Sequence, residues 1–134
     1  MKIYTSYFGN LRKLRENHIV PVSIARWKPK FYEGATMLSL APTVYMLKQA
    51  SEEEYLKMYD DILHKLDLKE ITKSLYHLGG GNDIALLCYE KPGDFCHRHL
   101  LADFLNKNGY EVSEFGVEKK EEKKEPEYIQ TSLF

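Results

Sequence analysis

The segment that most constrains the fold of this chain is a short, continuously apolar run from Ile84 to Cys88. A run of this length and composition is typical of a strand that is covered on both faces of a parallel sheet. Turn-forming residues follow at 91–94, and Asp94 is placed to cap the helix beyond them. The sequence therefore predicts a central strand, a tight loop and a helix whose first turn carries Cys96.

Strands and helices alternate along the rest of the chain. Apolar patterning predicts strands over residues 2–8, 18–25 and 110–115, the last at an edge of the sheet, and helices over residues 10–16, 51–66 and 67–78. Ser51 and Glu54 form a capping box at the start of the helix over residues 51–66. Residues 26–42 have no hydrophobic period and are predicted to form a long loop. The alternation predicts one α/β domain over residues 1–116, with a small, open, mainly parallel sheet and helices on both faces. This is a Rossmann-like or flavodoxin-like three-layer fold.

Composition and charge indicate which partners and which cellular location to expect for this domain. The chain has 134 residues, a net charge of −1 and two cysteines. This charge gives no overall attraction to nucleic acid or membranes, so binding of either kind must come from local patches. No apolar run approaches the roughly 20 residues that span a bilayer, and the N-terminus lacks the pattern of a signal peptide. Two cysteines are too few for the disulfide framework of a small secreted protein, so we expect a cytoplasmic location. We also expect no membrane partner.

Three reactive or charged side chains stand together at the start of the predicted helix: Cys96, His97 and Arg98. A helix N-terminus and nearby cations favour a thiolate, His97 can act as acid or base near neutral pH, and Arg98 can hold an anion with two hydrogen bonds. Cys96 and His97 are therefore the candidate catalytic residues, and Arg98 is a candidate phosphate contact. The alternative is structural, with Cys96 buried, His97 capping locally and Arg98 paired with Glu90 or Asp94.

Zinc ligation is the other chemistry that these residue types allow. Zinc ligands usually come in pairs about two to five residues apart, whereas seven residues separate Cys88 from Cys96. Because Cys88 also lies in an apolar strand, we expect it to be a buried core thiol. The sequence therefore predicts no metal and no cofactor.

A second group of candidate residues lies in the predicted loop after the second strand. Arg26, Trp27, Lys28 and Lys30 combine cations with an aromatic ring, a composition that can follow a phosphate backbone while stacking on bases. Ligands of open α/β sheets bind at the carboxyl ends of the strands, where Arg26 would lie beside the Cys96 turn. Arg26 is thus a second candidate phosphate contact, and the other three are candidate nucleic-acid contacts. The alternative is a solvated loop whose aromatic side chains fold back onto the sheet.

Three segments together form a signature: residues 86–92 followed by Cys96-His97-Arg98, residues 23–30, and residues 2–6. This signature resembles that of the family catalogued as domain of unknown function 488, over residues 1 to about 116. The resemblance implies a small α/β domain and brings no agreed reaction with it. The chemistry must therefore be argued from the residues themselves.

The C-terminal residues are predicted to lie outside the domain. Residues 117–127 are almost wholly Glu and Lys, as expected of a flexible linker. Residues 128–134 form a short motif, in which Gln130-Thr131-Ser132-Leu133-Phe134 resembles the pentapeptide by which bacterial DNA polymerases and repair proteins bind the replication sliding clamp. The second position of that pentapeptide, here Thr131, is variable. In that motif Leu133 and Phe134 would fill an apolar pocket, and Gln130 would satisfy polar groups at its edge. The alternative is that this segment docks on its own domain.

These features lead to three hypotheses about the function of the protein. The first is a bacterial or phage protein of nucleic-acid metabolism that binds a nucleotide or nucleic acid at the Cys96 turn and is recruited to the sliding clamp. As an enzyme, it would be a hydrolase or transferase acting on that ligand. The second is a non-catalytic adaptor domain in which the Cys-His-Arg turn is structural. A redox or sulfur-transfer enzyme that uses Cys96 alone is the third.

Overall fold

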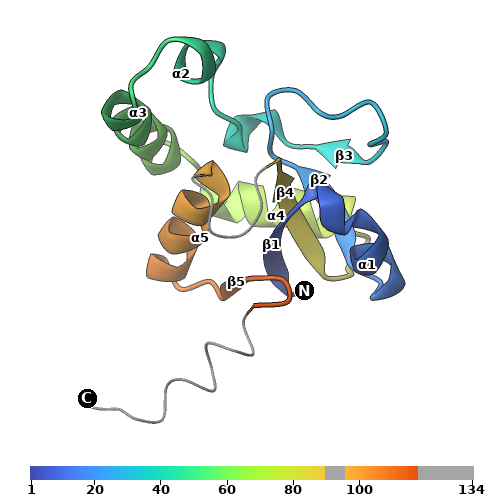
Figure 1. The fold of residues 1–134 in the computed structure, drawn as a ribbon. Helices are drawn as coiled ribbons and strands as arrows, with labels where there is room; N and C mark the ends of the chain where they lie inside the picture. Colours follow the sequence, from blue (N-terminus) through green and yellow to red (C-terminus); the bar gives the residue numbers. More distant parts are fainter. Residues whose placement is uncertain (90–95, 118–134) are drawn as a thin grey trace, which may run out of the picture.

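A five-stranded sheet forms the centre of the protein, of which the computed structural model describes residues 1–89 and 96–117 (Figure 1). The strands are β1 (Ile3–Tyr7), β2 (Val20–Ser23), β3 (Ala35–Thr36), β4 (Ile84–Cys88) and β5 (Val112–Glu114). They lie in the order β3-β2-β4-β1-β5, and every neighbouring pair is parallel. The predicted open, mainly parallel sheet is confirmed, with β5 at one edge as the sequence indicated.

Helices and helical turns connect the strands. They are η1 (Phe8–Asn10), α1 (Leu11–Glu16), η2 (Leu38–Leu40), α2 (Val44–Lys48), α3 (Glu52–His64), α4 (Leu68–Leu78) and α5 (His97–Lys107). The helices predicted over residues 10–16, 51–66 and 67–78 are confirmed. The prediction of a structureless loop over residues 26–42 was incomplete, because β3 and η2 lie within it. No helix in the described residues combines the length and the apolar character needed to cross a membrane.

The start of α5 differs from the prediction. This helix begins at His97, and Cys96 is its N-cap residue. The predicted N-cap at Asp94 is therefore wrong, and Asp94 itself lies outside the described residues. As a result, Cys96 has an extended backbone conformation at the junction between the loop and the helix.

The start of α3 is fixed by the capping box that the sequence predicted. The Ser51 hydroxyl accepts a hydrogen bond from the Glu54 backbone N–H, and the Glu54 carboxylate accepts one from the Ser51 N–H, each at 3.1 Å. Replacing Ser51 with alanine is expected to lower the free energy of unfolding by about 1 kcal/mol, because the Glu54 backbone N–H loses its hydrogen-bond acceptor. Urea denaturation measures this loss. The exposed Ser74, inside α4, provides the control: Ser74→Ala should change stability by less than about 0.5 kcal/mol.

The two faces of the sheet are covered by different helices (Figure 1). On one face, α3, α4 and α5 pack on the strands through a large apolar cluster that includes Val22, Ile84, Leu86, Tyr59, Leu75 and Leu101. On the other face, α1 and the loop after β2 cover a smaller cluster that includes Leu11, Leu14, Tyr32, Ala85 and Leu87. These packed layers give a three-layer α/β fold, as predicted.

The carboxyl ends of the strands meet at one edge of the sheet. β4 is the central strand, and its Leu87 pairs with Ser6 of β1 on one side and with Ser23 of β2 on the other. All five residues of β4 are buried, as expected of a strand covered on both faces. The segments that follow β1, β2 and β4 therefore leave the sheet side by side.

The loop after β2 is held against the sheet by one aromatic side chain. Tyr32 is buried and packs edge-to-face on Phe8, with 5.2 Å between the ring centroids. Its hydroxyl donates a hydrogen bond to the Ala35 carbonyl at 2.6 Å. The expectation that aromatic residues of this loop fold back is thus fulfilled by Tyr32, whereas Trp27 and Phe31 remain exposed.

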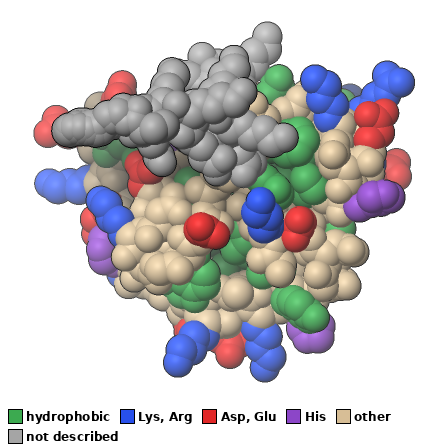
Figure 2. Space-filling view, turned by 90° about the horizontal axis from the view of Figure 1, so that it is seen from below, with side chains coloured by type: hydrophobic (Ala, Val, Ile, Leu, Met, Phe, Trp, Pro, Cys, Tyr) green, Lys and Arg blue, Asp and Glu red, His purple; other side chains and the backbone are tan. Residues whose placement is uncertain are grey.

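The opposite edge of the sheet carries mixed charge. Figure 2 views the molecule from the side at which β1 begins, and acidic and basic side chains are interspersed over its described residues. A nucleic-acid interface needs a concentration of cations. The described part of this face therefore offers no such interface, and the search for a site turns to the carboxyl edge.

Candidate functional site

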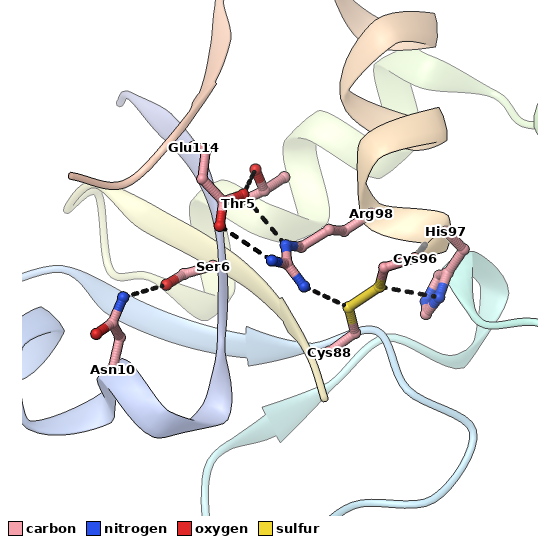
Figure 3. A network of polar contacts seen from close by, with 8 residues as sticks. All are labelled: Thr5, Ser6, Asn10, Cys88, Cys96, His97, Arg98 and Glu114. Atoms are coloured by element: carbon pink, nitrogen blue, oxygen red, sulfur yellow. Dashed lines mark hydrogen bonds and ion pairs between the residues drawn. A yellow bond between two sulfur atoms is a disulfide. The ribbon is translucent and has the colours of Figure 1, made fainter. Parts of the chain in front are cut away.

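A disulfide bond joins the end of the central strand to the start of α5. Cys88, the last residue of β4, and Cys96, the N-cap residue of α5, are bonded through their sulfur atoms (Figure 3). Both residues are buried. The prediction of burial for Cys88 is confirmed, but the prediction that it is a free core thiol is wrong. The pairing could not be predicted from sequence, because it depends on how α5 packs against the sheet.

His97 lies next to this bond with its ring orientation fixed. The imidazole is 5 % exposed, and its Nε2 atom is 2.7 Å from the Ile24 carbonyl oxygen. Because a carbonyl can only accept a hydrogen bond, Nε2 carries the proton in the neutral ring. Nδ1 then holds a lone pair and faces the Cys96 sulfur at 3.8 Å. This is the arrangement in which a histidine can accept a proton from a cysteine thiol.

The environment of His97 favours its neutral form. Burial lowers the pKa of His97 to about 4, and the positive charge of Arg98 and the neighbouring His99 act in the same direction. The hydrogen bond to the Ile24 carbonyl opposes this lowering only in part. Near pH 7 the ring is therefore neutral, and its Nδ1 lone pair is available to accept a hydrogen bond; the acid or base role of His97 stays a prediction.

Arg98 is the most deeply buried charged residue of the site, with 0 % of its side chain exposed. Its Nε and Nη2 atoms donate hydrogen bonds to the two carboxylate oxygens of Glu114, each at 3.1 Å. Thr5 also donates a hydrogen bond to this carboxylate, at 2.7 Å. Arg98 Nη1 also donates a hydrogen bond to the Cys88 sulfur at 2.9 Å (Figure 3). Arg98 therefore ties α5 to β5 and places a positive charge on the disulfide.

Glu114 is a site residue that the sequence analysis missed. The expected partners of Arg98 in a structural role were Glu90 and Asp94, which lie outside the described residues. Glu114 lies 16 positions after Arg98 and reaches it only because β5 pairs with β1. The guanidinium group of Arg98 is bound to Glu114 inside the protein. Its phosphate-binding role stays a prediction.

A cavity of about 370 Å³ opens at the disulfide. Its lining includes Cys88, Cys96 and His97 together with Arg26 and Trp27. The predicted meeting of Arg26 with the Cys96 turn at one edge of the sheet is thus confirmed. Pro42, Leu47, Tyr55 and Tyr89 complete much of the wall. Leu47 and Tyr55 belong to α2 and α3, whose contribution to the site was not predicted.

In the described part of the chain, one hydrogen bond fixes the Arg26 guanidinium group and leaves its two Nη atoms available for a ligand. Its Nε atom donates a hydrogen bond to the Pro42 carbonyl at 2.8 Å. Among residues 1–89 and 96–117, the two Nη atoms have no hydrogen-bond partner. Arginine binds anions through such paired donors, so Arg26 can present them to a ligand in the cavity.

The remaining residues of the aromatic and basic loop are divided between cavity and solvent. Trp27 is 50 % exposed, lines the cavity, and has the Lys48 ammonium group 5.6 Å from its ring centroid. Lys28 and Lys30 are exposed and are not among the cavity-lining residues. The structure therefore brings Trp27 to the Cys96 site and leaves the two lysines on the surface.

Among the residues that the structure describes, Cys88, Cys96 and His97 are the one group of three side chains close enough together to bind a metal ion. The Cys88 and Cys96 sulfurs and a His97 ring nitrogen all lie within 4.8 Å of one another. Metal ions bind cysteine as the thiolate, and in the disulfide form neither sulfur is available as one. The prediction that the protein binds no metal remains a prediction.

A second, larger cavity lies between α3 and α5. It has a volume of about 690 Å³, and its lining includes Leu56, Asp60, Phe104 and Lys107. None of the predicted site residues borders it. We therefore place the candidate site at the smaller cavity, where the reactive side chains lie.

The predicted clamp-binding residues Gln130, Leu133 and Phe134 lie outside the described residues, as does the predicted linker beyond Val117. The division into a domain, a linker and a terminal motif therefore stays a prediction.

Comparison with known proteins identifies the family. No curated protein matches the chain, and no solved structure does. The model of the family DUF488-N3a, described as the active DUF488-N3 subclade, matches residues 12–109. This range contains the strand β4, the disulfide, His97, Arg98 and Arg26, and it confirms the resemblance seen in the sequence. Because the match spans well over half of the chain, the protein belongs to the DUF488-N3a family.

Proposed function

We propose that the cavity beside Cys96 binds a nucleotide or a related phosphate-bearing ligand, on which Cys96 and His97 carry out hydrolysis or group transfer. The observation that carries the proposal is that Cys96, His97, Arg26 and Trp27 all line one cavity of about 370 Å³. A nucleotide has an anionic part and a planar part. The cavity offers a guanidinium group for the first, and aromatic rings for the second.

The chemistry would begin from the reduced form of Cys96. His97 Nδ1 would accept the thiol proton, and the resulting thiolate would attack an electrophilic centre of the ligand. The same His97 would return the proton to the leaving group. The hydrogen bond to Ile24 supports this role, since it leaves Nδ1 unprotonated and turned toward Cys96.

The single tryptophan provides a direct binding test, because Trp27 is the only one in the chain and lines the cavity. Titration of the reduced protein with a panel of nucleotides should change its fluorescence. In Arg26→Ala we expect the dissociation constant to rise by about tenfold or more, as for the loss of a charge-assisted hydrogen bond. Lys30→Ala removes an exposed cation outside the cavity and should leave the constant within about twofold. Equal affinity in Arg26→Ala and the parent would rule out this site.

A non-catalytic binding domain is the second candidate function. It is favoured by the participation of Arg98 and Glu114 in the interior of the fold and by the bond between the two cysteines. In this case Cys96→Ser and His97→Ala would lower stability while nucleotide turnover was absent in the parent as well. Turnover by the reduced parent that is lost in Cys96→Ser would exclude it.

Recruitment to the sliding clamp is proposed from the sequence of residues 128–134 alone. Surface plasmon resonance with a bacterial sliding clamp should detect binding of the full chain in the micromolar range. A Leu133→Ala, Phe134→Ala variant should lose the binding, because it removes the two apolar anchors. Thr131→Ala is the matched control, since this position varies in the motif. Undiminished binding by the double variant would contradict the proposal.

A further inference from the structure

We infer that Cys88 and Cys96 form a redox-active pair, whose disulfide withholds Cys96 from the cavity ligand and which low-molecular-weight thiols reduce through the cavity. The inference rests on the proposed function only in naming the activity that is controlled. The redox behaviour itself is argued from the contacts of the two sulfur atoms.

Each sulfur atom has a separate partner suited to the reduced state. Arg98 Nη1 contacts the Cys88 sulfur at 2.9 Å, and a cation at this distance favours the thiolate that reduction produces. His97 Nδ1 faces the Cys96 sulfur at 3.8 Å and can bind the proton of its thiol. Partners that stabilise the dithiol form make a disulfide easier to reduce. A disulfide that served only to hold the fold would need neither.

The disulfide is shielded from bulk solvent and yet reachable. Cys88 and Cys96 are 1 % and 4 % exposed, but both border the cavity at which Trp27 is half exposed. A small thiol can therefore enter where a protein surface cannot. The positive charge of Arg26 in the wall favours thiols that carry carboxylate groups, such as glutathione.

The surrounding fold is built to tolerate both states of the pair. β4 is held by parallel pairing with β1 along its whole length and with β2 over residues 84–87, and α5 is tied to β5 by the Arg98–Glu114 ion pair. Neither attachment runs through the disulfide, which links positions only eight apart in the sequence. Breaking the bond therefore frees the sulfur atoms without releasing a strand or a helix.

The exchange needs two thiol molecules. A first thiolate attacks the Cys96 sulfur, the Cys88–Cys96 bond breaks, and its electron pair goes to the Cys88 sulfur beside Arg98. A second thiolate attacks the outer sulfur of the mixed disulfide, which releases the oxidised small molecule and leaves Cys96 as a thiolate that takes up a proton beside His97. Two thiols are oxidised to one disulfide, and the protein disulfide is reduced to a dithiol.

Equilibration of the intact protein with buffers of reduced and oxidised glutathione tests the inference. After acid quenching and alkylation, mass spectrometry counts the free thiols, and the count is unambiguous because the chain has only two cysteines. We expect a reversible transition between zero and two thiols, with unchanged far-UV circular dichroism. A disulfide that resists excess glutathione in the folded protein, or reduction that occurs only with unfolding, would overturn the inference.

A double variant tests the role of Arg98 without leaving a single buried charge. The pair Arg98→Gln with Glu114→Gln removes both charges, and Glu114→Gln alone keeps the guanidinium group at Cys88. The double variant should favour the disulfide by about tenfold or more over the single variant, as for the loss of a charge-assisted hydrogen bond. Equal equilibrium constants would contradict the inference. If the double variant does not fold, His97→Gln provides a second test, because it can still donate to the Ile24 carbonyl but lacks the Nδ1 lone pair that faces Cys96. It should favour the disulfide by about fivefold, since the Cys96 thiol loses a hydrogen-bond acceptor, and an unchanged equilibrium constant would also contradict the inference.

The redox result and the nucleotide result are independent. Thiol counting requires no nucleotide, and nucleotide titration can be carried out on each redox form separately. A reversible disulfide in a protein that binds no nucleotide would contradict the proposed function and leave the redox inference standing. Equal nucleotide turnover in both redox forms would show that the disulfide does not regulate this activity.

Discussion

Replacing Glu114 with alanine is expected to lower the free energy of unfolding by about 3–5 kcal/mol, because it leaves a buried guanidinium group without its carboxylate. Arg98 donates two hydrogen bonds to Glu114, and its side chain is fully buried. Thr5 would lose its acceptor in the same substitution. Urea denaturation followed by circular dichroism measures the change, and the disulfide should be kept intact throughout.

Two further substitutions show whether the charge pair is the cause. Glu111→Ala removes an exposed carboxylate just before β5 and should change stability by less than about 0.5 kcal/mol. Glu114→Gln keeps an oxygen acceptor near Arg98 and should therefore cost less than Glu114→Ala. A loss below about 1 kcal/mol in Glu114→Ala would show that water or another group replaces the carboxylate, and that the ion pair does not hold α5 to β5.

Predictions from the sequence succeeded where the signal was local. The apolar run of residues 84–88 predicted the central strand, and the capping box at Ser51 and Glu54 predicted the start of α3. Each of these elements is specified by neighbouring residues, through burial on two faces or through hydrogen bonds within one turn. The parallel sheet followed from their alternation with helices.

The elements that the sequence did not reveal are short. β3 consists of two residues, Ala35 and Thr36, and α2 of five, from Val44 to Lys48. Segments of this length show no hydrophobic period, and the Thr43 cap of α2 is completed by Met46 instead of by an acidic residue. They form because neighbouring parts of the fold hold them, so their sequences alone carry little information.

The candidate site was predictable in its location but not in its contacts. Parallel strands bring their carboxyl ends together, and this rule alone placed Arg26 beside Cys96. The Cys88–Cys96 bond and the Arg98–Glu114 pair depend instead on how α5 and β5 pack on the sheet. Such contacts between distant elements leave no pattern in a single sequence. Through them, Arg98 both joins α5 to β5 and contacts the Cys88 sulfur.

The buried His97 gives the site a dependence on pH that can be measured as stability. The pKa of His97 is lowered to about 4 by burial, whereas a histidine in the unfolded chain has a pKa of about 6.5. Between these values the unfolded chain binds a proton that the folded protein does not. The free energy of unfolding should therefore fall as the pH decreases from about 6.5 to about 4, by about 3 kcal/mol in total from this residue.

Because carboxylates also titrate toward the acidic end of this range, the contribution of His97 must be taken as a difference between variants. His97→Gln can still donate a hydrogen bond to the Ile24 carbonyl, but its side chain does not titrate. Subtracting the stability curve of His97→Gln from that of the parent should leave a slope of about 1.4 kcal/mol per pH unit between pH 6 and pH 4.5. His77→Gln, at an exposed position of α4, should follow the parent curve. If the parent and His97→Gln curves were parallel, the imidazole would be accepting its proton in the folded state, and it could not be the buried neutral base that the site requires.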